Sequence, residues 1–193
     1  MGPRMALSRV LFIGRFQPFH KGHLAVIEWL LERFDEVVVV IGMASESHTW
    51  RNPFTAGERI MMIREALREK GIDLSKIITI TAPTLEVNIA SLHYILMLSP
   101  PIHAIATRNP IVESVARDIG VNVINPPLFR REVFAGEKIR LMIVAGDERW
   151  KELVPSSVAK IIEDIGGVER LKKLYRVCKE GGGAEKLCRV YQC

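Results

Sequence analysis

The decapeptide GRFQPFHKGH, residues 14–23, follows the short apolar run VLFI and leads into an amphipathic stretch. Downstream of it, apolar side chains recur at helical spacing as far as Phe34, which predicts a helix that starts just after His20. The run before it has the length and composition of a buried strand. The decapeptide is therefore predicted to form a strand-to-helix corner, with two histidines three residues apart at the start of the helix.

The rest of the chain repeats this alternation of apolar runs and amphipathic stretches, with Gly, Pro or Asn at the joins. The run at 36–42 is apolar on both faces, as expected when helices cover both sides of a parallel sheet. Thr55 and Glu58 have the spacing of a capping box, and Gly71 ends the same helix. The predicted strands are 9–14, 36–42, 76–82, 102–107 and 121–125, and the helices between the later strands are 55–71, 88–98 and 110–120.

The last third of the sequence has a different pattern, with helices expected to begin near Gly136, after Pro155 and at about Val168. The sequence thus predicts an α/β fold, an open parallel sheet with helices on both faces and a helical C-terminal segment. With 193 residues, we expect one domain over residues 1–193. Residues 1–8 and about 179–193 are expected to be loose ends.

Composition narrows the class of protein. The formal charge is +5 and the isoelectric point about 9.3, which suits anionic ligands without indicating nucleic acid as a partner. The longest apolar run, 37–44, is far below the roughly 20 residues that span a membrane, and the N-terminus lacks a signal-peptide core. We therefore expect a cytoplasmic protein with neither nucleic acid nor membrane as a partner.

All three cysteines lie in the last sixteen residues. Their odd number and the absence of a C-x-x-C pair argue against a closed zinc site, and a disulfide in the tail stays open. We expect no metal ligands from the protein itself.

The decapeptide offers a way to bind phosphate, because neither the P-loop pattern nor G-x-G-x-x-G occurs in the chain. Gly14 lets the backbone approach a ligand, and a side chain at Gly22 would block that approach. His20 and His23 can lie on one side of a helix N-terminus, which already attracts anions. With Arg15 they would form a polyphosphate cradle. The alternative is that one histidine caps the helix and the other faces solvent.

Three blocks carry a family resemblance. GRFQPFHKGHL resembles the H-x-G-H nucleotidyltransferase superfamily, while SHTWRNPFTAGERI (47–60) and LVPSSVAKIIEDIGGVERLKKL (153–174) resemble its archaeal nicotinamide mononucleotide adenylyltransferase branch. The resemblance implies a Rossmann-like fold and the conversion of ATP and nicotinamide mononucleotide (NMN) to NAD and pyrophosphate, with Mg2+ or another divalent cation. It also implies a homo-oligomer, a hexamer in the archaeal branch.

The resemblance assigns roles to particular residues. His20 and His23 would contact the ATP phosphates, with His23 nearest the α-phosphate, and Arg15 would touch the same phosphates. Arg51 would reach them from a second loop, and Arg140 would hold the departing pyrophosphate. For any one arginine the alternative is a solvated surface charge. Further substrate contacts are expected from Gly14, Phe16, Gly22, Glu86, Asn88, Asn109 and Lys138.

Departures from the family pattern affect both substrates. The signature S-G-T-E-[IV]-R reads AGEKIR here, so Ala135 and Glu137 bring no hydroxyl to the phosphates, although Lys138 can offset the added negative charge. Where the family has an acidic residue and a nicotinamide-stacking tryptophan, this chain has Thr84 and Ser91. Weaker ATP binding and an uncertain acceptor are the expected consequences.

Substitutes for the lost aromatic ring are Trp50 and His93, although the helical pattern around His93 favours a place in the core. Arg108 replaces a glycine before Asn109, where it would either clash with a nucleotide or add a phosphate contact. Two other functions stay open. One is transfer to nicotinate mononucleotide, flavin mononucleotide or phosphopantetheine, and the other is an ATP-binding module without turnover.

Overall fold

A computed structural model describes residues 7–83, 89–130 and 132–180. Its centre is a parallel sheet with the strand order β3-β2-β1-β4-β5. The longest pairing joins β1 and β2 in register from Arg9 opposite Glu36 to Gly14 opposite Ile41. This sheet is the open parallel sheet that the sequence predicts. The strands are β1 (Arg9–Gly14), β2 (Glu36–Ile41), β3 (Ile77–Thr81), β4 (Ala104–Ala106) and β5 (Val123–Ile124).

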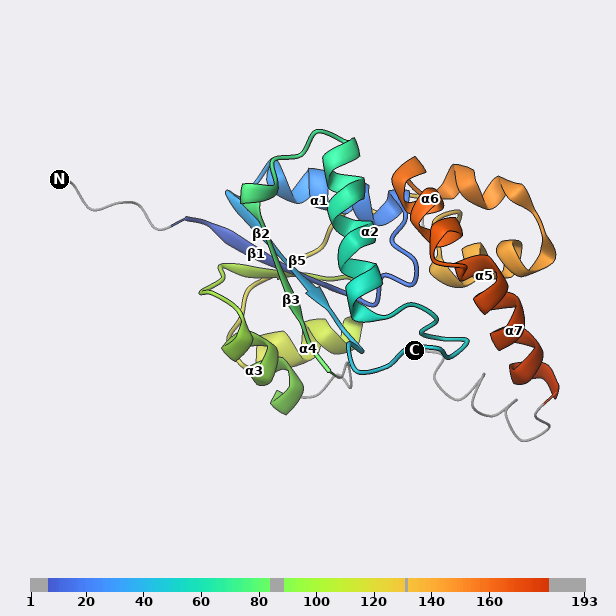
Figure 1. The fold of residues 1–193 in the computed structure, drawn as a ribbon. Helices are drawn as coiled ribbons and strands as arrows, with labels where there is room; N and C mark the ends of the chain where they lie inside the picture. The colour runs from blue at the N-terminus through green and yellow to red at the C-terminus, as the bar shows by residue number, and fades with distance from the viewer. Residues whose placement is uncertain (1–6, 84–88, 131, 181–193) are drawn as a thin grey trace.

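Helices cover both faces of the sheet, as predicted (Figure 1). Two separate hydrophobic clusters fill the space between the sheet and the helices, one on each face. The valines of β2 alternate between these clusters because successive side chains of a strand point to opposite faces. Helices α1 (Lys21–Leu31) and α2 (Ala56–Glu69) lie on one face, and α3 (Ile89–Leu98) and α4 (Pro110–Asp118) lie on the other.

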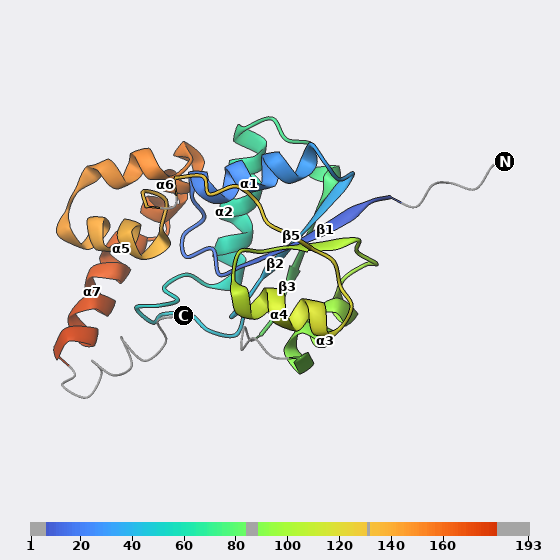
Figure 2. The same ribbon diagram turned by 180° about the vertical axis from the view of Figure 1, so that it is seen from behind.

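The C-terminal segment is helical, also as predicted, and it packs beside α2 (Figures 1 and 2). Trp150, Val158 and Ile162 are buried in the same cluster as α1 and α2, so this segment extends one core layer rather than forming its own. Its elements are α5 (Gly136–Ala145), η2 (Glu148–Leu153), α6 (Ser156–Asp164) and α7 (Gly167–Glu180), and a short turn of helix, η1 (Leu74–Lys76), precedes β3.

Local signals place most element ends correctly. The Thr55 hydroxyl accepts a hydrogen bond from the Glu58 backbone N–H, and the Glu58 carboxylate accepts one from the Thr55 N–H, which completes the predicted capping box. The last strand is shorter than predicted because β5 is an edge strand that pairs with β4 through two residues only. The ends expected to be loose lie largely outside the described residues, although α7 continues through Glu180.

Within the described residues, no helix is both long and apolar enough to cross a membrane. Cys178, on α7, is disulfide-bonded, which resolves for this cysteine the alternative that the sequence left open.

Candidate active site

The candidate site lies where the chain order of the sheet reverses. Strand β1 lies between β2 and β4. After β1 the chain builds β2 and β3 on one side of it, and later it adds β4 and β5 on the other side. In open α/β sheets, ligands bind beyond the carboxyl ends of the strands at this point. The segment that follows β1 there is the decapeptide, and the segments after β2 and β4 carry Arg51 and Asn109.

The two histidines cap the start of α1 in a reciprocal way. The Nδ1 atom of His20 accepts the backbone N–H of His23 at 3.3 Å, and Nδ1 of His23 accepts the backbone N–H of His20 at the same distance. Their rings stack with centroids 3.5 Å apart and planes 15° apart. The first turn of α1 holds no acidic side chain, so the positive end of the helix dipole is not neutralised there.

Burial keeps both imidazoles neutral. It lowers the pKa of His20 to about 4. Burial, and then the neighbouring His20 ring, lowers the pKa of His23 well below its usual value. Because each Nδ1 accepts a hydrogen bond, the proton of each neutral ring must be on Nε2. Neither Nε2 bonds to a described residue, so both N–H groups can donate to a phosphate oxygen.

Aromatic packing holds the histidine pair in place. Phe16 has a backbone φ of 52°, is 1% exposed, and presents its ring to that of His23 at 4.8 Å, edge to face. A Cβ atom on Gly14 would lie 2.7 Å from Cζ of Phe16, so Gly14 makes room for this ring. On the other side, a Cβ on Gly22 would lie 2.8 Å from Cβ of Phe134. The space that both glycines leave is taken by the protein's own side chains, that of Phe16 beside Gly14 and those of Phe134 and His20 beside Gly22.

Three guanidinium groups, those of Arg15, Arg51 and Arg140, lie close enough to interact electrostatically. Burial, then the charges of Arg15 and Arg51, lowers the pKa of Arg140 to about 10. Burial and the charge of Arg51 also lower the pKa of Arg15. Two atoms in this group, Arg15 Nη1 and Arg140 Nε, are buried with no hydrogen-bond partner among the described residues. Crowded cations with unused donors are suited to an anion with several oxygens.

The AGEKIR segment forms the start of α5 and brings Arg140 to this cluster. Arg140 Nη1 donates to the carbonyl of Gln17 at 2.7 Å, and its guanidinium lies 5.2 Å from the centre of the Trp50 ring. No side chain caps α5, because its N-cap position is Ala135. Lys138 is exposed and its Nζ lies 3.4 Å from the Glu132 carbonyl, outside the arginine cluster.

The acceptor side of the predicted site is described only in part. Thr84, Glu86 and Asn88 lie outside the described residues. Asn109 caps α4 by accepting the Ile111 N–H at 2.9 Å, and Arg108 Nη1 donates to the Pro126 carbonyl at 2.7 Å.

The two proposed substitutes for the nicotinamide-stacking ring have different environments. Trp50 contacts Tyr175 of α7 at 5.0 Å as well as Arg140. The core interpretation of His93 is wrong, because α3 buries Leu92 and Ile95 while His93 faces outward.

Sequence reasoning missed three buried polar residues that hold this site. Arg59 is fully buried and donates hydrogen bonds to the carbonyls of Arg15, Gly42, Met43 and Thr55. Asn52 donates to Glu46 at 2.8 Å, and the Gln17 amide pairs with the backbone of Phe54. No local pattern marks these residues, because most of their partners are far away in the chain.

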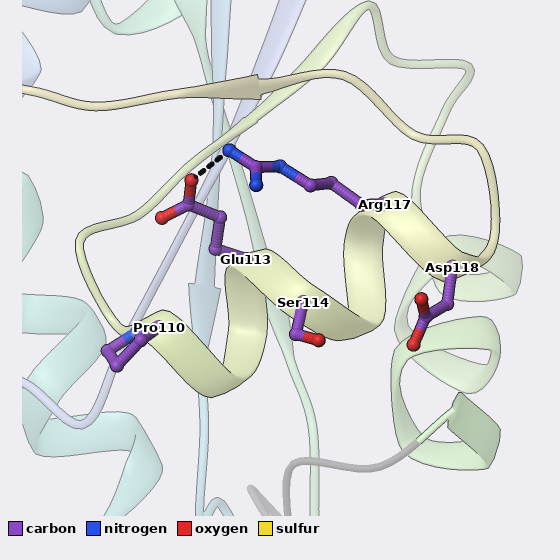
Figure 3. A pocket seen from close by; sticks show the side chains of 5 residues that line it. All are labelled: Pro110, Glu113, Ser114, Arg117 and Asp118. Carbon is purple, nitrogen blue, oxygen red and sulfur yellow. Dashed lines mark hydrogen bonds and ion pairs between the residues drawn. The ribbon is translucent and has the colours of Figure 1, made fainter.

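A surface hollow along α4 is lined by Pro110, Glu113, Ser114, Arg117 and Asp118 (Figure 3). Two of its three charged residues, Glu113 and Arg117, form an ion pair with each other, one helical turn apart. No residue of the predicted site lines this hollow, so it is not the candidate site.

The chain belongs to the cytidylyltransferase-like family, whose model matches residues 11–148. Among its relatives, a protein of Ignicoccus hospitalis named nicotinamide-nucleotide adenylyltransferase is 48% identical over 86% of this chain and 97% of its own length. A protein of Archaeoglobus fulgidus named only as an uncharacterized protein is 56% identical, over 86% of this chain and 94% of its own length. The sequence resemblance to adenylyltransferases of archaea is thus confirmed.

A solved structure shares the fold. It is a bifunctional NMN adenylyltransferase/ADP ribose pyrophosphatase from Francisella tularensis, complexed with AMP and an Mn ion. The TM-score is 0.69 at 20% identity, covering 97% of this chain and 57% of that protein. This likeness confirms the predicted Rossmann-like arrangement.

Proposed function

We propose that this protein transfers the adenylyl group of ATP to nicotinamide mononucleotide, giving NAD and pyrophosphate. Two observations carry the proposal: the stacked pair of neutral imidazoles at the start of α1, and a cluster of three arginines whose charges repel one another and one of which, Arg15, belongs to the same decapeptide. Such a site is complementary to a polyphosphate. The naming of the Ignicoccus hospitalis relative as a nicotinamide-nucleotide adenylyltransferase supports NMN as the acceptor.

The reaction needs alignment and charge neutralisation more than acid–base chemistry. The 5′-phosphate of NMN attacks the α-phosphorus of ATP in line, an oxygen–phosphorus bond forms, and the bond to the pyrophosphate oxygen breaks. Charge grows on the oxygens around the α-phosphorus and on the leaving group in the transition state. We assign the Nε2–H groups of His20 and His23 to the ATP phosphates, with His23 nearest the α-phosphate.

In this proposal the arginines neutralise the negative charge of the phosphates and of the departing pyrophosphate. Arg140 and Arg15 have buried, unused N–H donors, which suits them to the oxygens of the departing pyrophosphate. Arg51 enters from the segment after β2 and adds a third cation to the same cluster. Bringing these charges to one place offsets the repulsion between two anionic substrates.

We propose Mg2+ as the cation that accompanies ATP. Within the described ranges, no group of three or more His, Cys, Asp or Glu side chains is placed to hold a metal ion. In this proposal the cation enters bound to the substrate phosphates, where it would share their charge with the arginines. The Mn ion in the Francisella tularensis structure supports a divalent cation.

The test is an acceptor comparison with the purified protein. ATP and Mg2+ are supplied with NMN, nicotinate mononucleotide, flavin mononucleotide or phosphopantetheine, and pyrophosphate and the dinucleotide product are both measured. The proposal predicts equal amounts of NAD and pyrophosphate with NMN. Faster release with flavin mononucleotide or phosphopantetheine would replace the acceptor, and ATP binding without release under any condition would leave only a binding module.

A further inference from the structure

Gln17 is a buried amide for which the proposed reaction has no direct use. Its side chain lies between the decapeptide and the segment after β2 and is 4% exposed. Nε2 of Gln17 donates to the Phe54 carbonyl at 2.9 Å, and Oε1 of Gln17 accepts the Phe54 N–H at 2.9 Å. This amide satisfies both backbone groups of one residue 37 positions away, as a neighbouring strand would.

The backbone of Gln17 makes a second connection, to the AGEKIR segment. Its carbonyl oxygen accepts Arg140 Nη1 at 2.7 Å. Next to it, a Cβ atom on Gly136 would lie only 2.8 Å from the same oxygen, so the start of α5 approaches this carbonyl closely. One residue therefore contacts the two segments that carry Arg51 and Arg140, and it lies three positions before His20.

The surroundings leave Gln17 little freedom to move. Phe16 and Phe19 on either side are buried, with ring centroids 5.9 Å apart, and Arg59 fixes the carbonyl of Arg15 at 2.9 Å. A shift of the Phe54 backbone relative to Gln17 would also displace Arg51, three residues earlier in the chain, relative to Arg140. In phosphoryl transfer a displacement of about 1 Å can cost on the order of 100-fold in rate.

We propose that Gln17 is a positioning residue that sets the separation of Arg51 and Arg140 around the polyphosphate of ATP. It acts through the Phe54 backbone on one side and through its own carbonyl on the other, and it does not touch the substrate. This inference rests on the proposed adenylyl transfer. The competing explanation is that the amide only satisfies buried backbone groups and so contributes to folding alone.

The test is Gln17→Met, which keeps the side-chain length and removes both amide hydrogen bonds. We expect kcat/KM for ATP to fall at least about tenfold per folded molecule, with a higher KM for ATP. The matched control is Leu67→Ala, a fully buried core change in the C-terminal half of α2 that also lowers stability. Its kcat/KM should equal that of the wild type wherever it is folded. A Gln17→Met protein that is less stable but equally active per folded molecule would overturn the proposal.

A second variant keeps the test decisive where Gln17→Met does not fold. In Gln17→Glu, a protonated carboxyl can make both bonds to Phe54, whereas an ionised one has no proton to donate and places its charge against the Phe54 carbonyl. The KM for ATP relative to wild type should therefore rise with pH. If the KM for ATP of Gln17→Glu equals that of the wild type at every pH, Gln17 has no positioning role.

Failure of the reaction itself is detected separately. Wild type and Leu67→Ala must both make NAD, because neither alters the Gln17 contacts. If neither protein makes NAD, the proposed function fails. The affinity for ATP, measured by calorimetry, then tests whether Gln17 positions the phosphate-binding arginines. A dissociation constant at least about tenfold higher in Gln17→Met supports positioning of the phosphate-binding arginines, and an unchanged one contradicts it.

Discussion

Replacing Arg140 with methionine should separate stability from substrate binding. Burial and two neighbouring arginines lower the pKa of Arg140 to about 10. This shift means that the folded protein destabilises the charged guanidinium by about 3 kcal/mol relative to the unfolded chain. Against this, the variant loses a charged hydrogen bond to the Gln17 carbonyl, which contributes about 1.5–3 kcal/mol. The two effects nearly cancel, so the free energy of unfolding of the ligand-free protein should change by less than about 2 kcal/mol.

ATP binding should respond very differently. Loss of one or more charge-assisted hydrogen bonds to phosphate, about 1.5–3 kcal/mol each, predicts an affinity at least about tenfold weaker. Denaturant unfolding with and without Mg2+ and ATP measures both quantities, because bound ligand adds about 2.7 kcal/mol of stability at one hundred times its dissociation constant. Arg140→Lys is the control that keeps the charge without the planar fork. A variant destabilised by more than about 4 kcal/mol that keeps its ATP-induced stabilisation would refute the reasoning.

Three further results are expected. The unfolded chain binds a proton at His20 near pH 6.5 but the folded one only near pH 4, so stability is full above pH 6.5 and should fall by on the order of 3 kcal/mol between these values. Denaturation at pH 7, 5 and 4 checks this. His23, whose pKa is also lowered by burial, adds to the same loss, so a His20→Gln variant should show a smaller slope than the wild type and still keep the part due to His23. Nitrogen NMR should find the proton of both imidazoles on Nε2 at pH 7; a signal from a protonated Nδ1 contradicts the capping geometry. Arg51→Ala should mainly raise the KM for ATP, and an unchanged KM places that arginine outside the site.

The fold was largely predictable because its signals are local. Thr55 and Glu58 are three residues apart and complete a capping box within one turn, and the β-branched apolar run at 36–42 is typical of a strand covered on both faces. The order of the strands and the switch between β1 and β4 follow from connections that alternation alone does not encode. The fold class could thus be read from the sequence, and the place of each strand needed the structure.

The sequence marked the histidines and arginines of the candidate site but not the buried polar residues that hold them. The sequence treats helix capping and phosphate binding by the histidines as alternatives, yet the geometry allows both, since capping uses Nδ1 of His20 and His23 and leaves Nε2. The roles of Gln17 and Arg59 could not be predicted from the sequence, because these side chains bond to backbone groups as much as 44 residues away. No spacing rule identifies a side chain that bonds to a distant carbonyl.

The most direct measurement of the central claim is the rate of NAD formation by His23→Ala at saturating ATP and NMN. If the His23 Nε2–H supports the α-phosphate as its charge grows, kcat should fall about 100-fold or more. The dissociation constant of ATP should change by no more than a factor of a few in the same variant. A kcat within a factor of a few of the wild type would show that the imidazole pair at the start of α1 is not where adenylyl transfer takes place.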